Sequence, residues 1–270
     1  FFSIVVTGHY SLWLGEIGGE IVRWATLLFC IMLISGIILW WPKNKAAAKQ
    51  RFRFKWKENM KWKRKNYDLH NVLGFYAAWI VLFAGLSGLV WTFECVRNAE
   101  YWLATRGEKK VEFQNPIAKK PNKFNLQPNG IDSVFASKIK EYNDVHLALV
   151  SFPKTDSTAY SISIYPDKDY YSRDAFYYNQ YTFQEIPVKA YGKYTDANGG
   201  EKLSRMNYDI HIGNVFGLTG RILMFFGTLI GASLPITGFL IWWGRKFKKK
   251  NNYHRQQLQY QFNHQTNQHQ

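Results

Sequence analysis

Three long apolar stretches divide the chain. They cover residues 21–41, 72–91 and 217–243, and few charged positions interrupt them. A hydrocarbon core of about 30 Å takes about 20 residues of α-helix, so each stretch is long enough to cross a bilayer. The pattern predicts a mainly α membrane protein with three transmembrane helices in this chain.

Between the second and third stretches the pattern changes to shorter segments. Residues 131–142 have helical periodicity, whereas 147–152, 159–165 and 175–188 are rich in β-branched and aromatic residues and predict strands. The simplest assembly is one helix against a small antiparallel sheet, which makes a small α+β domain inserted before the last membrane helix.

The end of the chain, residues 254–270, is rich in Gln and Asn and predicts a disordered tail. The predicted layout is a leading segment with a membrane helix (1–41), a basic loop (42–67), a second membrane helix (68–95), the α+β domain (96–206), a third membrane helix (207–244) and a basic, polar tail (245–270).

The positive charge is concentrated beside the apolar stretches. The net charge is +16 from 35 Lys and Arg, of which eleven lie within residues 43–65 and five within 245–250. Both clusters follow a Trp-Trp pair, as the positive-inside rule and the interfacial aromatic belt predict for cytoplasmic loops. We therefore expect both clusters on the cytoplasmic side, facing anionic lipid, with residues 1–20 and 96–206 outside. No nucleic-acid recognition motif accompanies the basic run, so no nucleic-acid partner is predicted.

Two distant segments carry the same spaced pattern, here called the ruler: a His, two Gly, a small residue followed by Gly, and Trp-Trp. The pairs are His9 with His211, Gly15 with Gly217, Gly18 with Gly220, Ser35-Gly36 with Thr237-Gly238, and Trp40-Trp41 with Trp242-Trp243, each 202 positions apart. Both segments lead into helices that run from outside to inside. The two histidines are therefore expected at the same depth of the bilayer.

Three of the seven histidines stand where a membrane helix is expected to begin: His9, His70 and His211. His70 and His211 end the similar motifs NYDLH and NYDIH, in which Asp68 and Asp209 are placed to cap the N-termini of the following helices. The remaining histidines are expected at polar surfaces; they are His146, His254, His264 and His269. Because the second helix begins at the cytoplasmic face, a membrane thickness separates His70 from the other two.

Two facing imidazoles at one depth are suited to be the axial ligands of a b-type haem, which would carry electrons because it has no open coordination position. The carboxylates of a di-iron site are missing. Small residues would leave room for the haem; they are Gly15, Gly18, Gly19, Gly213, Gly217 and Gly220. Arg23 and Arg221, membrane-level cations without an evident anion, would pair with haem propionates. Interfacial anchoring of the histidines, close helix packing at the glycines and snorkelling of the arginines remain the alternatives.

The cysteines and glycine motifs exclude other redox chemistries. Cys30 and Cys95 are the two cysteines, and no CxxC occurs, so covalent haem, an iron-sulfur cluster and structural zinc lack their ligands. No dinucleotide-binding GxGxxG follows a predicted strand. An electron donor would therefore be a cytoplasmic partner or a quinol.

The His-x5-Gly spacing with its small-Gly and Trp-Trp pairs, the YD-[LI]-H motifs and the inserted α+β segment resemble the PepSY-associated transmembrane (PepSY_TM) family over essentially the whole chain. The resemblance implies a PepSY-like periplasmic domain, bis-histidine b haems and, in several members, reduction of ferric siderophores at the bacterial inner membrane. It also implies four membrane helices. The first, with a histidine at its cytoplasmic end, is absent from this chain, which begins at Phe1, so an upstream segment is expected. A second haem would then lie between His70 and that histidine.

The sequence thus predicts a membrane b-type cytochrome that reduces a periplasmic ferric siderophore or other ferric chelate. Aromatic residues of the α+β domain offer either a platform for the chelate or the apolar face of a sheet; they are Tyr165, Tyr170, Tyr171, Phe176, Tyr177, Tyr178 and Tyr181. One alternative is a non-catalytic scaffold or regulatory subunit that binds a periplasmic partner. A transporter is disfavoured, because Pro235 is the one helix breaker at membrane depth.

Overall fold

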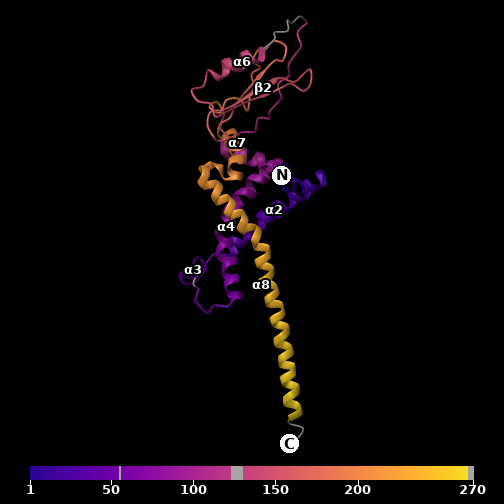
Figure 1. The fold of residues 1–270 in the computed structure, drawn as a ribbon, viewed down its shortest axis with the longest axis vertical. Coiled ribbons are helices and arrows are strands. Elements are labelled where there is room, and N and C mark those ends of the chain that lie inside the picture. Colours follow the sequence, from indigo (N-terminus) through magenta and orange to yellow (C-terminus); the bar gives the residue numbers. More distant parts are fainter. Residues whose placement is uncertain (55, 123–129, 267–270) are drawn as a thin grey trace. The chain divides into compact units, whose positions relative to one another are not determined.

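The computed structural model describes residues 1–54, 56–122 and 130–266 (Figure 1). In chain order its elements are α1 (Phe2–Ser11), α2 (Gly15–Trp40), α3 (Lys45–Arg51), α4 (Trp62–Thr92), α5 (Glu94–Thr105), α6 (Gly130–Ile139), β1 (Leu147–Ser151), β2 (Tyr160–Tyr165), β3 (Asp174–Tyr178), α7 (Gly199–Ile212), the 3-10 turn η1 (Asn214–Phe216) and α8 (Gly217–Thr266). The chain forms two compact units. Unit 1 is Phe1–Cys30 with Phe83–Ile222, and unit 2 is Ile31–Leu82 with Leu223–Gln270.

Three helices of the described chain are long and apolar enough to cross a membrane: Gly15–Trp40, Trp62–Thr92 and Asn214–Lys246. They contain the three predicted stretches almost completely, and together with the small sheet between the second and third they confirm the predicted fold class. α2 ends directly before Trp41 and Pro42, where the proline removes a backbone donor and restricts the preceding residue.

A short helical hairpin begins each half of the ruler. α1 ends at Ser11 and α7 ends at Ile212, and the membrane helix that follows begins at Gly15 or Gly217. These two glycines have almost the same positive φ, 59° and 57°, a backbone conformation that side chains disfavour. The equal spacing of the ruler therefore encodes two hairpins that share this glycine, although the turns before it differ: Leu12 and Trp13 have positive φ, whereas Asn214–Phe216 form a 3-10 turn.

A second glycine closes each hairpin. A Cβ atom on Gly18 would lie 1.6 Å from the carbonyl oxygen of Ser11, and one on Gly220 would lie 2.1 Å from that of Gly213. Ser11 and Gly213 are themselves 202 positions apart, so the same backbone contact occurs in both hairpins. Only glycine allows the membrane helix to approach the end of the preceding helix this closely.

The α+β segment forms an antiparallel sheet in the order β1-β2-β3, with Val150 opposite Ile162 and Ile162 opposite Phe176. Helix α6 lies beside this sheet (Figure 1). It contributes apolar side chains to the core. The buried centre consists of Ile162, Ile164, Phe176 and Tyr178, and the helix adds Ile131, Val134, Phe135 and Ile139. The predicted helix and the first two predicted strands are confirmed. The third strand is shorter than expected and ends at Tyr178, because a turn at residues 179–182 precedes the single bridge between Tyr178 and Glu185.

Two predictions about helix ends are wrong. Asp68 and Asp209 do not cap helices: Asp68 lies inside α4 and pairs with Arg64 at 3.1 Å, while Asp209 lies near the C-terminus of α7 and is fully buried. Likewise His70 does not begin its helix, because α4 already starts at Trp62. The residues before each NYD motif already form the first turns of its helix, so the motif lies inside the helix.

The prediction of a disordered tail is wrong up to Thr266, because α8 continues to that residue. Gln, Lys and Arg are good helix formers, and neither Gly nor Pro follows Gly244 to stop the helix. Residues 267–270 of the tail lie outside the described residues.

Helices α5 and α7, on either side of the sheet in sequence, contact each other in unit 1. The side-chain nitrogen of Asn207 lies 2.9 Å from both carboxylate oxygens of Glu100, and that of Asn198 lies 2.8 Å from the Tyr101 hydroxyl. Burial raises the pKa of Glu100, and donation from Asn207 acts in the opposite direction. These two helices cross the predicted domain boundaries at 95/96 and 206/207. Helix α7 therefore belongs both to the region that follows the sheet and to the second hairpin.

Candidate functional site

Two of the predicted site residues face each other in unit 1. The ring of His9, near the end of α1, lies 5.9 Å from that of His211, near the end of α7, measured between centroids, with 59° between the ring planes. Two imidazoles that bind one metal ion at about 2 Å each hold their ring centroids about 6 Å apart. The separation in the structure is thus suited to a shared metal.

The orientation of His211 is fixed through one ring nitrogen. Its Nδ1 lies 2.9 Å from the carbonyl oxygen of Ala84 and 3.1 Å from Ser87 Oγ, both on α4. Because a carbonyl oxygen only accepts, Nδ1 carries the hydrogen, and Nε2 keeps its lone pair. Metal-binding histidines characteristically donate their other N–H to a carbonyl or carboxylate in this way.

His70 belongs to unit 2 and has a similar arrangement. Its Nδ1 lies 2.8 Å from the hydroxyl oxygen of Thr237 on α8. A cavity of about 190 Å³ borders it. Among the described residues, no other histidine lines this cavity.

The ruler glycines have structural roles at the hairpins, as described above. A Cβ atom on Gly15 or Gly217 would meet nothing within 4 Å, and the close contacts of Gly18 and Gly220 are within their own hairpins. Their proposed role of making room for a haem stays a prediction. Gly88, by contrast, lies beside the imidazole itself, since its Cβ would be 3.7 Å from Cε1 of His211.

The two arginines have different surroundings. Arg23 does have an anion, contrary to expectation: its Nη1 lies 3.1 Å from Oε1 of Glu20, one turn earlier on α2, and its guanidinium lies 4.3 Å from the centre of the Phe93 ring. Arg221 donates through Nε, at 2.9 Å, and Nη2, at 2.5 Å, to Oδ1 of Asn214. Its Nη1 makes no hydrogen bond within the part of the chain that the structure describes.

A buried carboxylate lies behind Arg221. Asn214 donates at 2.5 Å to Oδ1 of Asp209, which also accepts from the backbone N–H of Tyr170 at 3.2 Å. Asp209 is fully buried, and its Oδ2 has no partner among the described residues. The carboxylate therefore fastens the 167–172 loop of the α+β domain to the helix that carries His211.

Aromatic side chains run from His211 towards the sheet. The successive ring centroids, from His211 to Trp91, Tyr208, Tyr170 and Tyr165, are 5.1, 6.3, 5.0 and 6.3 Å apart. Trp91, Tyr208 and Tyr170 are each nearly half exposed. Of the predicted aromatic platform, this row includes Tyr165 and Tyr170. Phe176 and Tyr178 instead belong to the core of the sheet.

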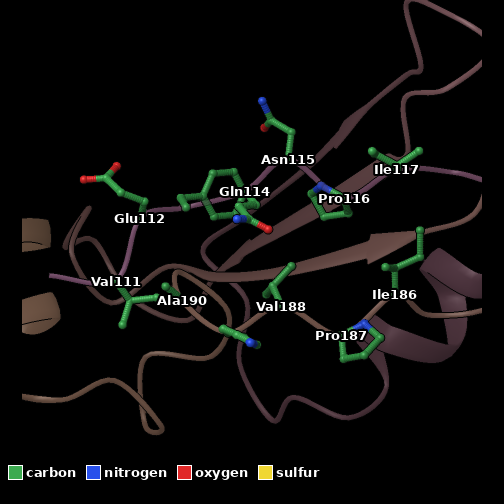
Figure 2. Close-up of a pocket in the computed structure, with 12 residues that line it drawn as sticks. Val111, Glu112, Gln114, Asn115, Pro116, Ile117, Ile186, Pro187, Val188 and Ala190 are labelled. Carbon is green, nitrogen blue, oxygen red and sulfur yellow. The ribbon is translucent and has the colours of Figure 1, made fainter.

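A separate cavity of about 490 Å³ lies in the α+β segment (Figure 2). Two extended segments, 111–117 and 186–190, run along it in opposite directions, with the side chain of Val188 between them. It contains none of the predicted site residues. In the described chain no group of three or more His, Cys, Asp or Glu side chains forms a metal site.

Several residues of this site were not foreseen: Ala84, Ser87, Trp91 and Asn214. Nothing in the local sequence marks them, because they meet His211 or Arg221 only after the chain has folded. The ruler does include Thr237. There, a small residue followed by Gly predicts close helix packing and not a contact with His70.

The model of the PepSY-associated TM region matches residues 1–245. No curated protein matches the chain.

Proposed function

Since the chain belongs to the PepSY-associated transmembrane family, we propose that it is a membrane b-type cytochrome. In this proposal His9 and His211 would hold a haem b, which would supply electrons for the reduction of a ferric siderophore or another ferric chelate. The basic clusters orient the protein so that the α+β domain lies in the periplasm of a bacterial inner membrane. A cytoplasmic partner or a quinol supplies the electrons.

The proposal rests on the pairing of His9 with His211, whose ring centroids lie 5.9 Å apart. Nδ1–H of His211 donates to the carbonyl oxygen of Ala84. A haem b held by His9 and His211 would supply a one-electron couple, and with both histidines bound it would have no open position for the acceptor. The acceptor must therefore receive electrons from outside the coordination sphere.

The remaining residues of the site act around this pair. Asp209 and Asn214 fix the loop that carries Tyr170 and hold Arg221 in place. Arg221 has an unused Nη1 for a haem propionate, and Arg23 would share its guanidinium between Glu20 and a propionate. The exposed rings of Trp91, Tyr208 and Tyr170 offer the acceptor a contact surface. Trp91 at one end of this surface contacts His211.

A second haem at His70 is part of the same proposal. His70 would hold it together with a second histidine, and among the described residues no second histidine borders the cavity at His70. The structure supports only the His70 side, through the hydrogen bond to Thr237 and the adjoining cavity.

The absorption spectrum of the purified full-length protein tests the proposal. We expect a Soret band and, after reduction with dithionite, an α-band of b-type haem. Addition of a ferric chelate should then reoxidise the reduced protein. A protein that binds no haem after expression with ample haem supply would contradict the proposal.

One observation favours a second candidate, a scaffold or regulatory subunit. The 490 Å³ cavity is flanked by extended backbone, and within the described residues the backbone of 111–115 and 187–189 makes no hydrogen bonds. Such groups can pair with an extended peptide. A protein without haem that binds a periplasmic partner through this cavity would support the scaffold.

A further inference from the structure

The two outer edges of the sheet differ in how they are covered. The edge of β3 has a neighbouring segment, because the backbone N–H of Ile186 donates to the carbonyl oxygen of Tyr177, and that of Ala175 donates to the carbonyl oxygen of Gly192. At the other edge, the described residues provide β1 with no backbone partner apart from β2. Every residue of β1 is at least partly exposed.

The open edge of β1 lacks the features that usually protect such an edge. Its sequence, LALVS, contains no charged residue and no proline, and its five pairs with β2 follow one another without a bulge. Leu147 and Leu149 are 41% and 48% exposed. Natural sheets cover an edge of this kind or place Lys, Pro or a bulge on it, because its N–H and C=O groups can pair with another strand. The β1 edge is therefore suited to pairing.

The faces of the sheet determine which partner fits this edge. One face packs against α6, and the opposite face carries Tyr165, whose ring contacts Tyr170, which in turn contacts Tyr208 of α7. Two identical strands that pair in antiparallel orientation are related by a two-fold axis perpendicular to the sheet, so each copy keeps the same face on the same side. Both copies of α7 then lie on one side of the joint sheet, as two copies in one bilayer require.

We propose that β1 pairs in antiparallel orientation with β1 of a second copy of this chain, in a register centred on Leu149. Leu149 then lies opposite Leu149 of the second copy, and Ala148 lies opposite Val150, so uncharged side chains meet along the whole strand. Asp144 and Lys154 stand equally far before and after the centre, and both are exposed. A pair of opposite charges therefore closes each end of the interface.

Neighbouring registers are less favourable. With the centre moved to Val150, Asp144 would lie opposite Asp156 of the second copy, and like charges directly opposite each other destabilise a sheet. With the centre moved to Ala148, Asp144 would lie opposite the apolar ring of Phe152. The charges that flank β1 thus select the register centred on Leu149.

Disulfide cross-linking of the full-length protein in its membrane tests the pairing. In a Cys30→Ser, Cys95→Ser background, Leu149→Cys should cross-link two copies on mild oxidation. Directly opposite Cα atoms are about 4.5–5.5 Å apart, and a disulfide spans about 4.4–6.8 Å. Ser163→Cys is the matched control, because Ser163 lies opposite Leu149 on β2. Its two copies would be three strand spacings, about 14 Å, apart, so it should not cross-link.

Two further positions test the register. Leu147 should lie opposite Ser151 of the second copy. Leu147→Cys and Ser151→Cys should each fail to cross-link alone, since the two copies of either residue lie about 13 Å apart along the strands. Co-expression of the two variants should produce the cross-link between them.

The affinity of the dimer is measured by light scattering over a concentration series of the purified protein in detergent. Leu149→Lys places two positive charges opposite each other and should raise the dimer Kd by at least about 10-fold. The monomer should keep its fold, as limited proteolysis would show, because Leu149 does not belong to the core of the sheet. Asp144→Lys should weaken the dimer by a smaller factor, and Lys154→Asp added to the same chain should restore it.

Three outcomes would overturn the proposal. They are the absence of the Leu149→Cys cross-link, equal cross-linking of Leu149→Cys and Ser163→Cys, and cross-linking of Leu149→Cys only to a different protein. The second outcome would indicate random collision, and the third would assign the edge to another partner. None of them bears on a haem at His9 and His211, so this proposal and the proposed function fail separately.

Discussion

The imidazole of His9 lies opposite that of His211 although the two residues are 202 positions apart, with ring centroids 5.9 Å apart. If both bind one iron, His9→Ala and His211→Ala should each remove the same haem. Pyridine haemochrome assays and the reduced spectrum measure this. His146→Ala, an exposed histidine of the α+β segment, is the control and should leave the haem content unchanged.

His70→Ala should affect a spectroscopically different centre and leave the first one intact. Retention of normal haem content and potential in either His9→Ala or His211→Ala would show that the pairing is wrong.

The hairpin glycines should be intolerant of even one added carbon. In Gly18→Ala the new methyl group would meet the carbonyl oxygen of Ser11, and in Gly220→Ala that of Gly213, so backbone must move. We expect a loss of at least about 1–3 kcal/mol in each, visible as a lower Tm in detergent and as lower haem content.

Gly36→Ala is the matched control for these substitutions. It lies inside α2, and its Cβ would meet nothing within 4 Å. The change should be neutral or stabilising by about 0.5–1 kcal/mol. Equal effects of all three substitutions would contradict the hairpin contacts.

A tyrosine-carboxylate bond should stabilise the α+β segment. The hydroxyl of Tyr142 donates to Oδ2 of the buried Asp174 at 2.5 Å, and Oδ1 of Asp174 accepts from the backbone of Tyr194. Tyr142→Phe should cost about 1.5–3 kcal/mol, since a hydrogen bond to a charged group is lost. Limited proteolysis of the full-length protein, followed at the 130–180 segment, measures the loss.

The same segment should lose stability in alkali. Burial, reinforced by Asp174, raises the pKa of Tyr142, and burial, with Glu185 adding to it, raises that of Tyr178 to about 12. An unfolded tyrosine titrates near pH 10, so this stability is complete below about pH 10 and declines as the pH rises towards 12. Tyr142→Phe should make the decline shallower. An unchanged slope would show that Tyr142 does not contribute to it.

The aromatic row should affect the acceptor and not the haem. Tyr208→Leu removes the ring between Trp91 and Tyr170. Reoxidation of the dithionite-reduced protein by a ferric tris-catecholate, measured by stopped flow, should slow by roughly 2- to 10-fold, the value of one aromatic contact. Phe152→Leu, an exposed aromatic change elsewhere in the α+β segment, should leave the rate unchanged. A normal rate in Tyr208→Leu would exclude this surface as the contact.

The native cysteines report the orientation. Cys95 is exposed at the start of α5, and Cys30 is buried. A membrane-impermeant maleimide applied to intact spheroplasts should label one site, which Cys95→Ser abolishes and Cys30→Ser does not. Labelling that requires lysis would place the α+β segment in the cytoplasm and reverse the assigned topology.

The sequence predicted those features that depend on local patterns. Twenty-residue apolar runs identify membrane helices because spanning depends on length and composition alone. β1 and β2 followed from their apolar, aromatic and β-branched residues. The end of β3 did not, because the turn after Tyr178 lies inside an equally aromatic segment.

The candidate site was predicted in part, because its contacts join distant segments. The ruler predicted His9 and His211 at one depth, and their rings lie 5.9 Å apart in the structure. It could not reveal that Ala84 and Ser87 hold His211, since α4 lies between the two hairpins in sequence and carries no copy of the pattern. Asp209 was misassigned because a capping rule needs the true first turn, and α7 begins ten residues earlier, at Gly199.

The two hairpins allow the same substitution to be compared at two places in one protein. Two glycines of the first hairpin have a twin 202 residues further on: Gly15 and Gly217 share almost the same positive φ, and Gly18 and Gly220 have the same kind of contact with a carbonyl oxygen. The turns before them differ, because Leu12 and Trp13 have positive φ whereas Asn214–Phe216 form a 3-10 turn. A difference between twin variants therefore measures the turn and its neighbours, and equality of the two measures what the glycine position itself requires.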